Sequence, residues 1–227
     1  MGADLIRSVG AGVVLALGAA VVPAHAALPV VVAVDGTLCD LTKTLAAGAA
    51  SVTCLIPPGG DPHSYRLKPS DRSQIAKSDL VLHIGFGLTP SARKLKSPGT
   101  VVAVGEVALP SYGGSDPHVW HDPANSAAMV RAISRFLSPV LAAGDRAALQ
   151  QRTARAVAVF QALQGWEAQQ FNALPSAQRV LVTDHRTYSH LANRFGLVEI
   201  AMLDSHCLLY TSPSPRDQRG SRMPSSA

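Results

Sequence analysis

Cysteine, aromatic residues and clustered charge are all scarce in this chain of 227 residues. It has 3 cysteines, 5% aromatic residues and a formal net charge of +5. Its lysines and arginines form no basic stripe with interleaved aromatic side chains, which argues against nucleic acid as a partner. Hydrophobic residues make up 47% of the chain. That share excludes a disordered polymer and fits a folded core of Val, Leu, Ala and Ile.

No apolar run after residue 26 is long enough to cross a membrane, which takes about 20 residues. In the first 26 residues, Arg7 is followed by an apolar stretch over residues 9–22 and then by A-H-A, which has the A-x-A pattern. That order is typical of a secretory signal peptide and its cleavage site. A membrane anchor is the competing interpretation, but the stretch is short for one. We expect residues 1–26 to be a signal peptide and the mature protein to be periplasmic.

Two of the cysteines, Cys39 and Cys54, are close in sequence, and Cys207 is far from both. In an oxidising compartment the first two can pair. Two buried thiols on neighbouring elements fit equally well, because a sequence does not show whether two Cα atoms come within disulfide reach, about 4.4–6.8 Å. Both interpretations stay open, and for an exported protein we predict the disulfide.

The first half of the chain alternates between β-branched runs and helical spacings. A continuous run such as PVVVAV is typical of a strand that is buried on both faces of a parallel sheet. Strands that alternate with short helices predict a parallel α/β lobe, which we place at residues 27–122. The expected strands are residues 29–34, 51–56, 79–84 and 100–104, and the expected helices are residues 37–48 and 70–76, the second with Ser70 as its N-cap.

Residues 123–175 form a predicted helical region. Its second helix, over residues 145–174, would be about 45 Å long at 1.5 Å per residue, which suits a rigid strut between two lobes. Strand, helix and strand patterns at residues 179–183, 187–195 and 197–202 then begin a second α/β lobe. The fold class is therefore α/β, with two Rossmann-like parallel-sheet lobes bridged by a long helix.

The second lobe is predicted to be incomplete and to occupy residues 176–206. Residues 207–227 are rich in Ser, Pro and Arg and have no periodicity. A genuine flexible tail is one interpretation. We favour a non-native tail on a truncated copy, because two strands are too few to close the second lobe.

The strongest chemical signal is a repeated Asp-Pro-His, which places His63 and His118 directly after proline. Proline restricts the backbone, so each histidine is held on a stiff loop. His185 follows a predicted strand at its carboxyl end, where ligands bind in open parallel sheets. A single histidine after Asp-Pro is more often a turn residue, but the repeat together with His185 favours a metal site. We predict that the three face one cleft between the lobes.

Imidazole nitrogen suits Zn²⁺, which it binds at about 2.0–2.1 Å with tetrahedral geometry. Mn²⁺ is less favoured, because carboxylate and water serve it better. Asp61 and Asp116 are candidates to orient the histidine rings from outside the metal. Of the other histidines, His83 is expected in or near the core, His121 is an auxiliary ligand at best, and His190 is expected at the surface.

Three passages, at residues 57–88, 116–133 and 181–197, together resemble the zinc/manganese-type solute-binding proteins of ABC transporters. The resemblance covers about residues 29–204, and the sequence of the first lobe is most similar to those of cyanobacterial members. It implies two α/β lobes bridged by one long helix, with the metal between them. Its first three ligands match His63, His118 and His185, and a histidine at the third position resembles the zinc type.

What the resemblance implies is a monomeric receptor that passes Zn²⁺ to the membrane permease of an ABC transporter, and not an enzyme. The family's fourth, acidic ligand has no counterpart here, its long acidic and histidine-rich loop is missing, and His121 stands where leucine is usual. A manganese receptor of the same family is one alternative. A zinc hydrolase is another, because three histidines and a water are also a catalytic pattern, but the chain has no H-E-x-x-H.

Overall fold

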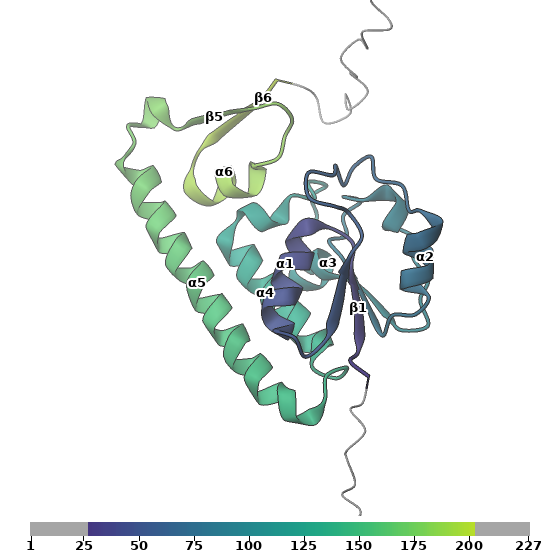
Figure 1. Cartoon of the computed structure of the whole chain (residues 1–227). Helices are drawn as coiled ribbons and strands as arrows, with labels where there is room; N and C mark the ends of the chain where they lie inside the picture. The colour runs from purple at the N-terminus through teal and green to yellow at the C-terminus, as the bar shows by residue number, and fades with distance from the viewer. Residues whose placement is uncertain (1–26, 203–227) are drawn as a thin grey trace, which may run out of the picture.

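The computed structural model describes residues 27–202 (Figure 1). The predicted signal peptide and the predicted non-native tail lie outside these residues. Within them, no helix is both long enough and apolar enough to cross a membrane.

The first lobe is built on a parallel sheet of four strands in the order β2-β1-β3-β4. The central strand β1 is buried on both faces, and Val31, Val32 and Ala33 are all 0% exposed. This is the environment that its uninterrupted β-branched run predicts. The strands are β1 Val30–Ala33, β2 Ser51–Cys54, β3 Leu80–His83 and β4 Thr100–Ala103.

Helices cover both faces of this sheet. Val31 and Ala33 point into a large core that includes residues of α1 and α4, whereas Val32 points to a smaller core that includes Ile75 of α2. Figure 1 shows α1 and α4 on one side of β1 and α2 on the other. The helices are α1 Gly36–Ala46, α2 Pro69–Ile75, α3 Val104–Ala108 and α4 Pro123–Leu137, with short 3₁₀ helices η1 Pro90–Ala92 and η2 Val119–His121.

The start of α2 differs from the prediction. Lys68, and not Ser70, is its N-cap, and Pro69 takes the first helical position, where a missing N–H costs nothing. The backbone amide of Lys68 donates to Oδ2 of Asp71 at 2.8 Å. The same oxygen accepts from the Tyr65 hydroxyl at 2.7 Å, so a buried carboxylate fixes the entry to this helix.

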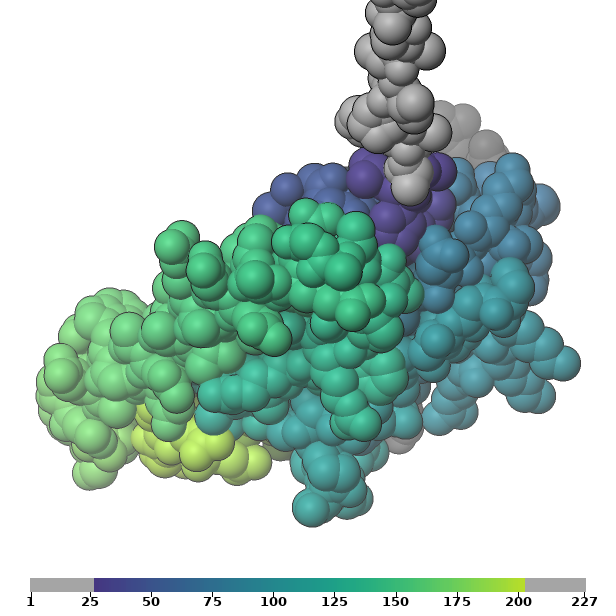
Figure 2. Space-filling model, turned by 90° about the horizontal axis from the view of Figure 1, so that it is seen from below, coloured from purple at the N-terminus to yellow at the C-terminus, as the bar shows by residue number. Residues whose placement is uncertain are grey.

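The long linking helix is confirmed. After η3 Ala143–Asp145, α5 runs over Arg146–Ala173, 28 residues or about 42 Å. Its first half packs on α4 and buries Leu149 and Val157, whereas Trp166 in its second half is 58% exposed. Figure 2 shows the surface of α5, in green, extending from the first lobe to the end of the molecule that carries the second lobe, in yellow.

The second lobe begins after η4 Ser176–Gln178 with two parallel strands, β5 Val180–Thr183 and β6 Val198–Ala201. Helix α6, Ser189–Phe195, joins them and ends at Gly196, whose φ of 66° is left-handed. Alternate residues of the strands, such as Val182 and Ile200, are 59% and 50% exposed. The predicted α/β class is therefore confirmed, with a four-stranded first sheet and a two-stranded second sheet in the described residues.

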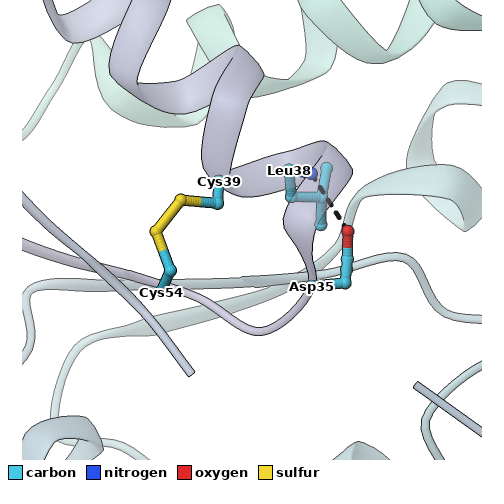
Figure 3. Close-up of a disulfide and its surroundings, with 4 residues drawn as sticks. All are labelled: Asp35, Leu38, Cys39 and Cys54. Carbon is cyan, nitrogen blue, oxygen red and sulfur yellow. Dashed lines mark hydrogen bonds between the residues drawn. A yellow bond between two sulfur atoms is a disulfide. The ribbon is translucent and has the colours of Figure 1, made fainter. Parts of the chain in front are cut away.

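A disulfide joins Cys39 of α1 to Cys54 of β2 (Figure 3). Their Cα atoms are 5.6 Å apart, inside the range that a disulfide requires. The structure thus resolves the choice between a disulfide and two thiols in favour of the disulfide. It ties the first helix of the lobe to an edge strand of the sheet.

We predict that replacing both Cys39 and Cys54 by serine lowers the free energy of unfolding by about 3 kcal/mol, because a loop of about 15 residues is no longer closed in the unfolded chain. Denaturant titration measures the loss, and the parent protein with reductant should fall close to the variant. Mass spectrometry of the unreduced parent should show two protons fewer than the reduced form. Two freely alkylated thiols at these positions would contradict the disulfide.

Asp35 starts α1 at the carboxyl end of β1. Its Oδ1 accepts from the backbone amide of Leu38 at 3.0 Å (Figure 3), whereas its Oδ2 is buried without a hydrogen-bond partner in the described part of the chain. Burial raises the pKa of this carboxyl to about 6, against the lowering effect of nearby backbone amides. The folded protein therefore binds a proton on Asp35 at a higher pH than the unfolded chain does.

Asp35→Asn should stabilise the protein more at pH 8 than at pH 5, by on the order of 1 kcal/mol. The folded-state pKa lies above the ordinary value of 3.8, so the stability that protonation allows is present at low pH and is lost as the pH rises through about 6. The amide keeps an oxygen to cap α1 but carries no charge. Denaturant titrations at the two pH values measure the difference, and the exposed Asp40→Asn is the matched control. An equal effect at both pH values would contradict the assignment.

Candidate metal centre

The structure brings together the three histidines that the sequence singles out. His63 lies on the loop between β2 and α2, His118 precedes η2, and His185 follows β5. The Nε2 atoms of His63 and His118 are 3.0 Å apart. One ring nitrogen from each of the three lies within 4.8 Å of the others. Two lobes thus present three imidazoles to a single point.

The spacing of these nitrogens suits one small cation. Four tetrahedral ligands at about 2.0–2.1 Å from Zn²⁺ would have their donor atoms about 3.3 Å apart. The ring nitrogens of His63 and His118 are 3.0 Å apart, and all three lie within 4.8 Å of one another, a range that includes that value. Nε2 of His185 is also buried without a hydrogen-bond partner among the described residues, which leaves its electron pair available.

Asp116 fixes the ring of His118. One carboxylate oxygen, Oδ1, accepts from ring Nδ1 at 2.7 Å and from the His118 backbone amide at 3.0 Å. Nδ1 therefore carries the proton, and Nε2 offers its electron pair to the centre. Burial acts to raise the pKa of Asp116, but the hydrogen bonds from His118 outweigh it and hold the pKa below its ordinary value. The ionised carboxylate and the ring form one unit, as expected from the sequence.

The expected ring-orienting role of Asp61 does not match its contacts. Its Oδ1 accepts from the backbone amide of His63 at 2.9 Å and so shapes the loop, not the ring. At the third histidine the partner is Asp184, whose Oδ1 lies 3.1 Å from ring Nδ1 of His185 and accepts from its backbone amide at 2.7 Å. The adjacent Asp-His pair is the signal in the sequence that points to Asp184, and the prediction of ring-orienting residues did not include it.

The electrostatics of the site favour a neutral ring at His63. Burial, and then the neighbouring charge of His118, lower the pKa of His63 below its ordinary value. A neutral imidazole is the form that binds a metal, because the ligand nitrogen must be free of its proton. The surroundings of His63 thus favour the form of its ring that can bind a cation.

The model of the ZnuA family, described as the periplasmic component A of a zinc-uptake complex, matches residues 31–219. The chain belongs to the ZnuA family.

Relatives within and around the ZnuA family carry different metals in their names. The zinc-binding protein TroA of Treponema pallidum is 30% identical over 178 residues, and the match covers 74% of this chain and 58% of TroA. The manganese-binding lipoprotein MntA of Halalkalibacterium halodurans is 31% identical over 183 residues, with the same two coverages, 74% and 58%. The chain spans less than two thirds of the length of these relatives.

Solved structures of ZnuA-type proteins have the same fold. The periplasmic zinc-binding protein TroA of Treponema pallidum superimposes with a TM-score of 0.75 at 26% identity, over 85% of this chain and 72% of TroA. The Fe(III)-bound YtgA of Chlamydia trachomatis gives a TM-score of 0.67 at 25% identity, over 74% of this chain and 62% of YtgA. Zinc, manganese and iron all occur among these names, so membership of the ZnuA family leaves the metal open.

The other histidines in the described part of this ZnuA-family chain, His83, His121 and His190, do not join the cluster. His83 is partly buried, as expected. His121 packs its ring on Tyr188 at a centroid distance of 4.2 Å and is absent from the group of converging ligand atoms, so the structure gives no support for an auxiliary ligand. The expectation of a surface position for His190 is wrong: its ring is partly buried and contacts Asp116, Asn125 and Tyr112.

Asp116→Ala should weaken metal binding by about tenfold to a hundredfold, because partners that orient metal-binding histidines contribute that much. The zinc affinity of Asp116→Asn should fall between those of the parent and Asp116→Ala, since the amide oxygen still accepts from the ring. Asp61→Ala is the matched control, because Asp61 binds the backbone amide of its histidine and not the ring. Competition with a zinc chelator measures all four proteins. Equal losses in the Asp116→Ala and Asp61→Ala variants would contradict a ring-orienting role.

Proposed function

We propose that this chain is an extracytoplasmic solute-binding protein that captures Zn²⁺ between its two lobes and delivers it to the permease of an ABC transporter. His63, His118 and His185 are the proposed ligands. The observation that carries the proposal is the convergence of three ring nitrogens from both lobes within 4.8 Å. Membership of a family described as a periplasmic zinc-uptake component supports the location and the partner.

The donor set supports zinc over manganese. Three imidazole nitrogens suit Zn²⁺, whereas Mn²⁺ is better served by carboxylate and water oxygens. The carboxylates of Asp116 and Asp184 lie behind the rings and are bound to their Nδ1 atoms. The described residues therefore supply nitrogen and not oxygen to the metal, with a water or a further carboxylate to complete the tetrahedron.

The proposed organisation is a signal peptide over residues 1–26, a first lobe over 27–122, a helical region over 123–175 and a second lobe over 176–206. The protein is proposed to act as a periplasmic monomer. A metal between two lobes presents a combined surface that differs from that of the separated lobes. A permease can recognise this surface without any covalent step.

A zinc hydrolase fits the contacts less well. Such an enzyme needs a carboxylate or histidine that is free to act as a general base beside the metal-bound water. Each of the aspartates nearest the three histidines is already engaged with the backbone or ring of its own histidine. The described part of the chain thus holds a ligand set without an evident base.

The ligand assignment is tested with a variant in which His63, His118 and His185 are all replaced by alanine. After loading and dialysis, elemental analysis should find about one Zn²⁺ per parent chain and almost none in the variant, because a structural zinc needs several converging donors. His83→Ala, a histidine outside the cluster, is the control and should retain the zinc.

Competition between Zn²⁺ and Mn²⁺ on the parent then tests the metal. Tighter binding of Mn²⁺ would overturn the choice of zinc, and a triple variant that keeps its zinc would overturn the ligands. Turnover of an ester or peptide by pure zinc-loaded protein would favour the hydrolase instead.

A further inference from the structure

Helix α6 of the second lobe holds both ends of the segment that carries His118. Ring Nε2 of His190 lies 3.2 Å from the backbone oxygen of Asp116. Four residues further on, the Arg194 guanidinium contacts Oδ2 of Asp122 at 2.9 Å through Nε and at 2.7 Å through Nη2. Residues four apart lie on the same face of a helix. One face of α6 therefore contacts both ends of the segment 116–122.

The contact at the first end involves several hydrogen bonds. Nε2–H of His190 donates to the Asp116 carbonyl, while its Nδ1 lies 3.3 Å from Nδ2 of Asn125, which can donate to it. The backbone amide of Asp116 in turn donates to the hydroxyl of Tyr112 at 3.2 Å, and the Tyr112 ring packs against His190. Both backbone polar groups of Asp116 are thus fixed, and the carboxylate of the same residue orients the ring of His118.

The contact at the second end is a buried anchor. The Asp122 side chain is 7% exposed. Its Oδ1 accepts from the backbone amide of Ala124 at 2.9 Å and caps α4. Its Oδ2 accepts from Nε and Nη2 of Arg194. The Arg194 side chain is 39% exposed, so it is the carboxylate side of this charge-assisted pair that is shielded from water. Arg194 thus ties α6 to the start of α4 in the first lobe.

His185, the third proposed ligand, lies on the same lobe as α6. His185 precedes His190 by a short loop, and that loop is itself held by Glu199, whose Oε1 accepts from the backbone amides of Thr187 and Tyr188 at 2.8 and 2.9 Å. Any slide of α6 along the first lobe would therefore carry His185 with it. The position of α6 decides the distance between His185 and His118.

We propose that His190 and Arg194 are positioning residues that set His185 in register with His118. The proposal rests on the proposed function, since it assumes that both histidines bind the metal. The contacts of His190 and Arg194 are with Asp116 and Asp122, and not with the Nε2 atoms of the proposed ligands. The two residues therefore act by aligning the lobes and not on the ion. Loss of Arg194 should therefore weaken zinc binding only where a second-lobe ligand is present to be misplaced.

A double-mutant cycle tests this on the full chain, with Zn²⁺ as the probe and chelators of graded strength as competitors. Arg194→Ala and His190→Leu are each made in the parent and in His185→Ala. In the parent each should weaken zinc binding by about tenfold, in the range found for residues that support metal ligands. In His185→Ala, where only first-lobe ligands remain, the Arg194→Ala loss should shrink to less than about threefold, because coupled residues are not additive.

Conservative and matched variants separate positioning from folding. Arg194→Lys keeps a charge on Asp122, and His190→Gln keeps a donor for the Asp116 carbonyl, so both should recover part of the affinity. Asn193→Ala, an exposed residue of the same helix, and Arg155→Ala, an exposed arginine of α5, should leave zinc binding unchanged. Thermal melts with chelator show which variants are folded. If an alanine or leucine variant is unfolded, the corresponding conservative variant replaces it in the double-mutant cycle.

The outcomes separate the positioning role from the ligand assignment. A loss on Arg194→Ala in the parent that largely disappears in His185→Ala supports the register. Equal losses on Arg194→Ala in both backgrounds, or no loss in either, would overturn the positioning role while leaving the three ligands in place. If His185→Ala itself binds zinc as tightly as the parent, the ligand set of the proposed function is wrong, and the register is wrong with it.

Discussion

The hydrogen bond between the Asp116 carboxylate and the His118 ring is the contact on which the site depends. It fixes the proton on Nδ1 and turns Nε2 toward the other histidines. The same aspartate has its backbone held by Tyr112 of the first lobe and His190 of the second. Orientation of a proposed ligand and alignment of the lobes therefore depend on the same residue, and a change in either affects the other.

The topology explains how histidines so far apart in sequence meet. Parallel strands present their carboxyl ends at one edge of a sheet, and loops at that edge are the usual place for a ligand. His63 lies on the loop after β2, and His185 follows β5 of the other sheet. The helix α5, about 42 Å long, carries the chain from the first lobe to the second. A stiff connection of this kind suits a site whose ligands come from two lobes.

Much of the fold follows from the sequence, because its signals are local. The β-branched run around Val31 and the spacing of Leu149 and Val157 each report a buried face. Which carboxylate would orient which ring was less predictable. Asp61 and Asp116 share the same Asp-Pro-His motif, yet only Asp116 reaches the ring, because the choice depends on the local turn of each loop. His190 was misjudged for a related reason: its partners are 65 and 74 residues away in sequence.

Charge is the remaining question for a site of three neutral rings. Three imidazoles leave the full charge of a divalent cation uncompensated at the metal. Here Asp116 and Asp184 lie one hydrogen bond behind two of the rings, so they would raise the basicity of the imidazoles toward the proposed ion. A direct carboxylate ligand would instead place hard oxygen on the metal, which manganese prefers. Carboxylates behind the rings keep nitrogen as the donor, which supports the zinc that we propose within a family whose members are named for several metals.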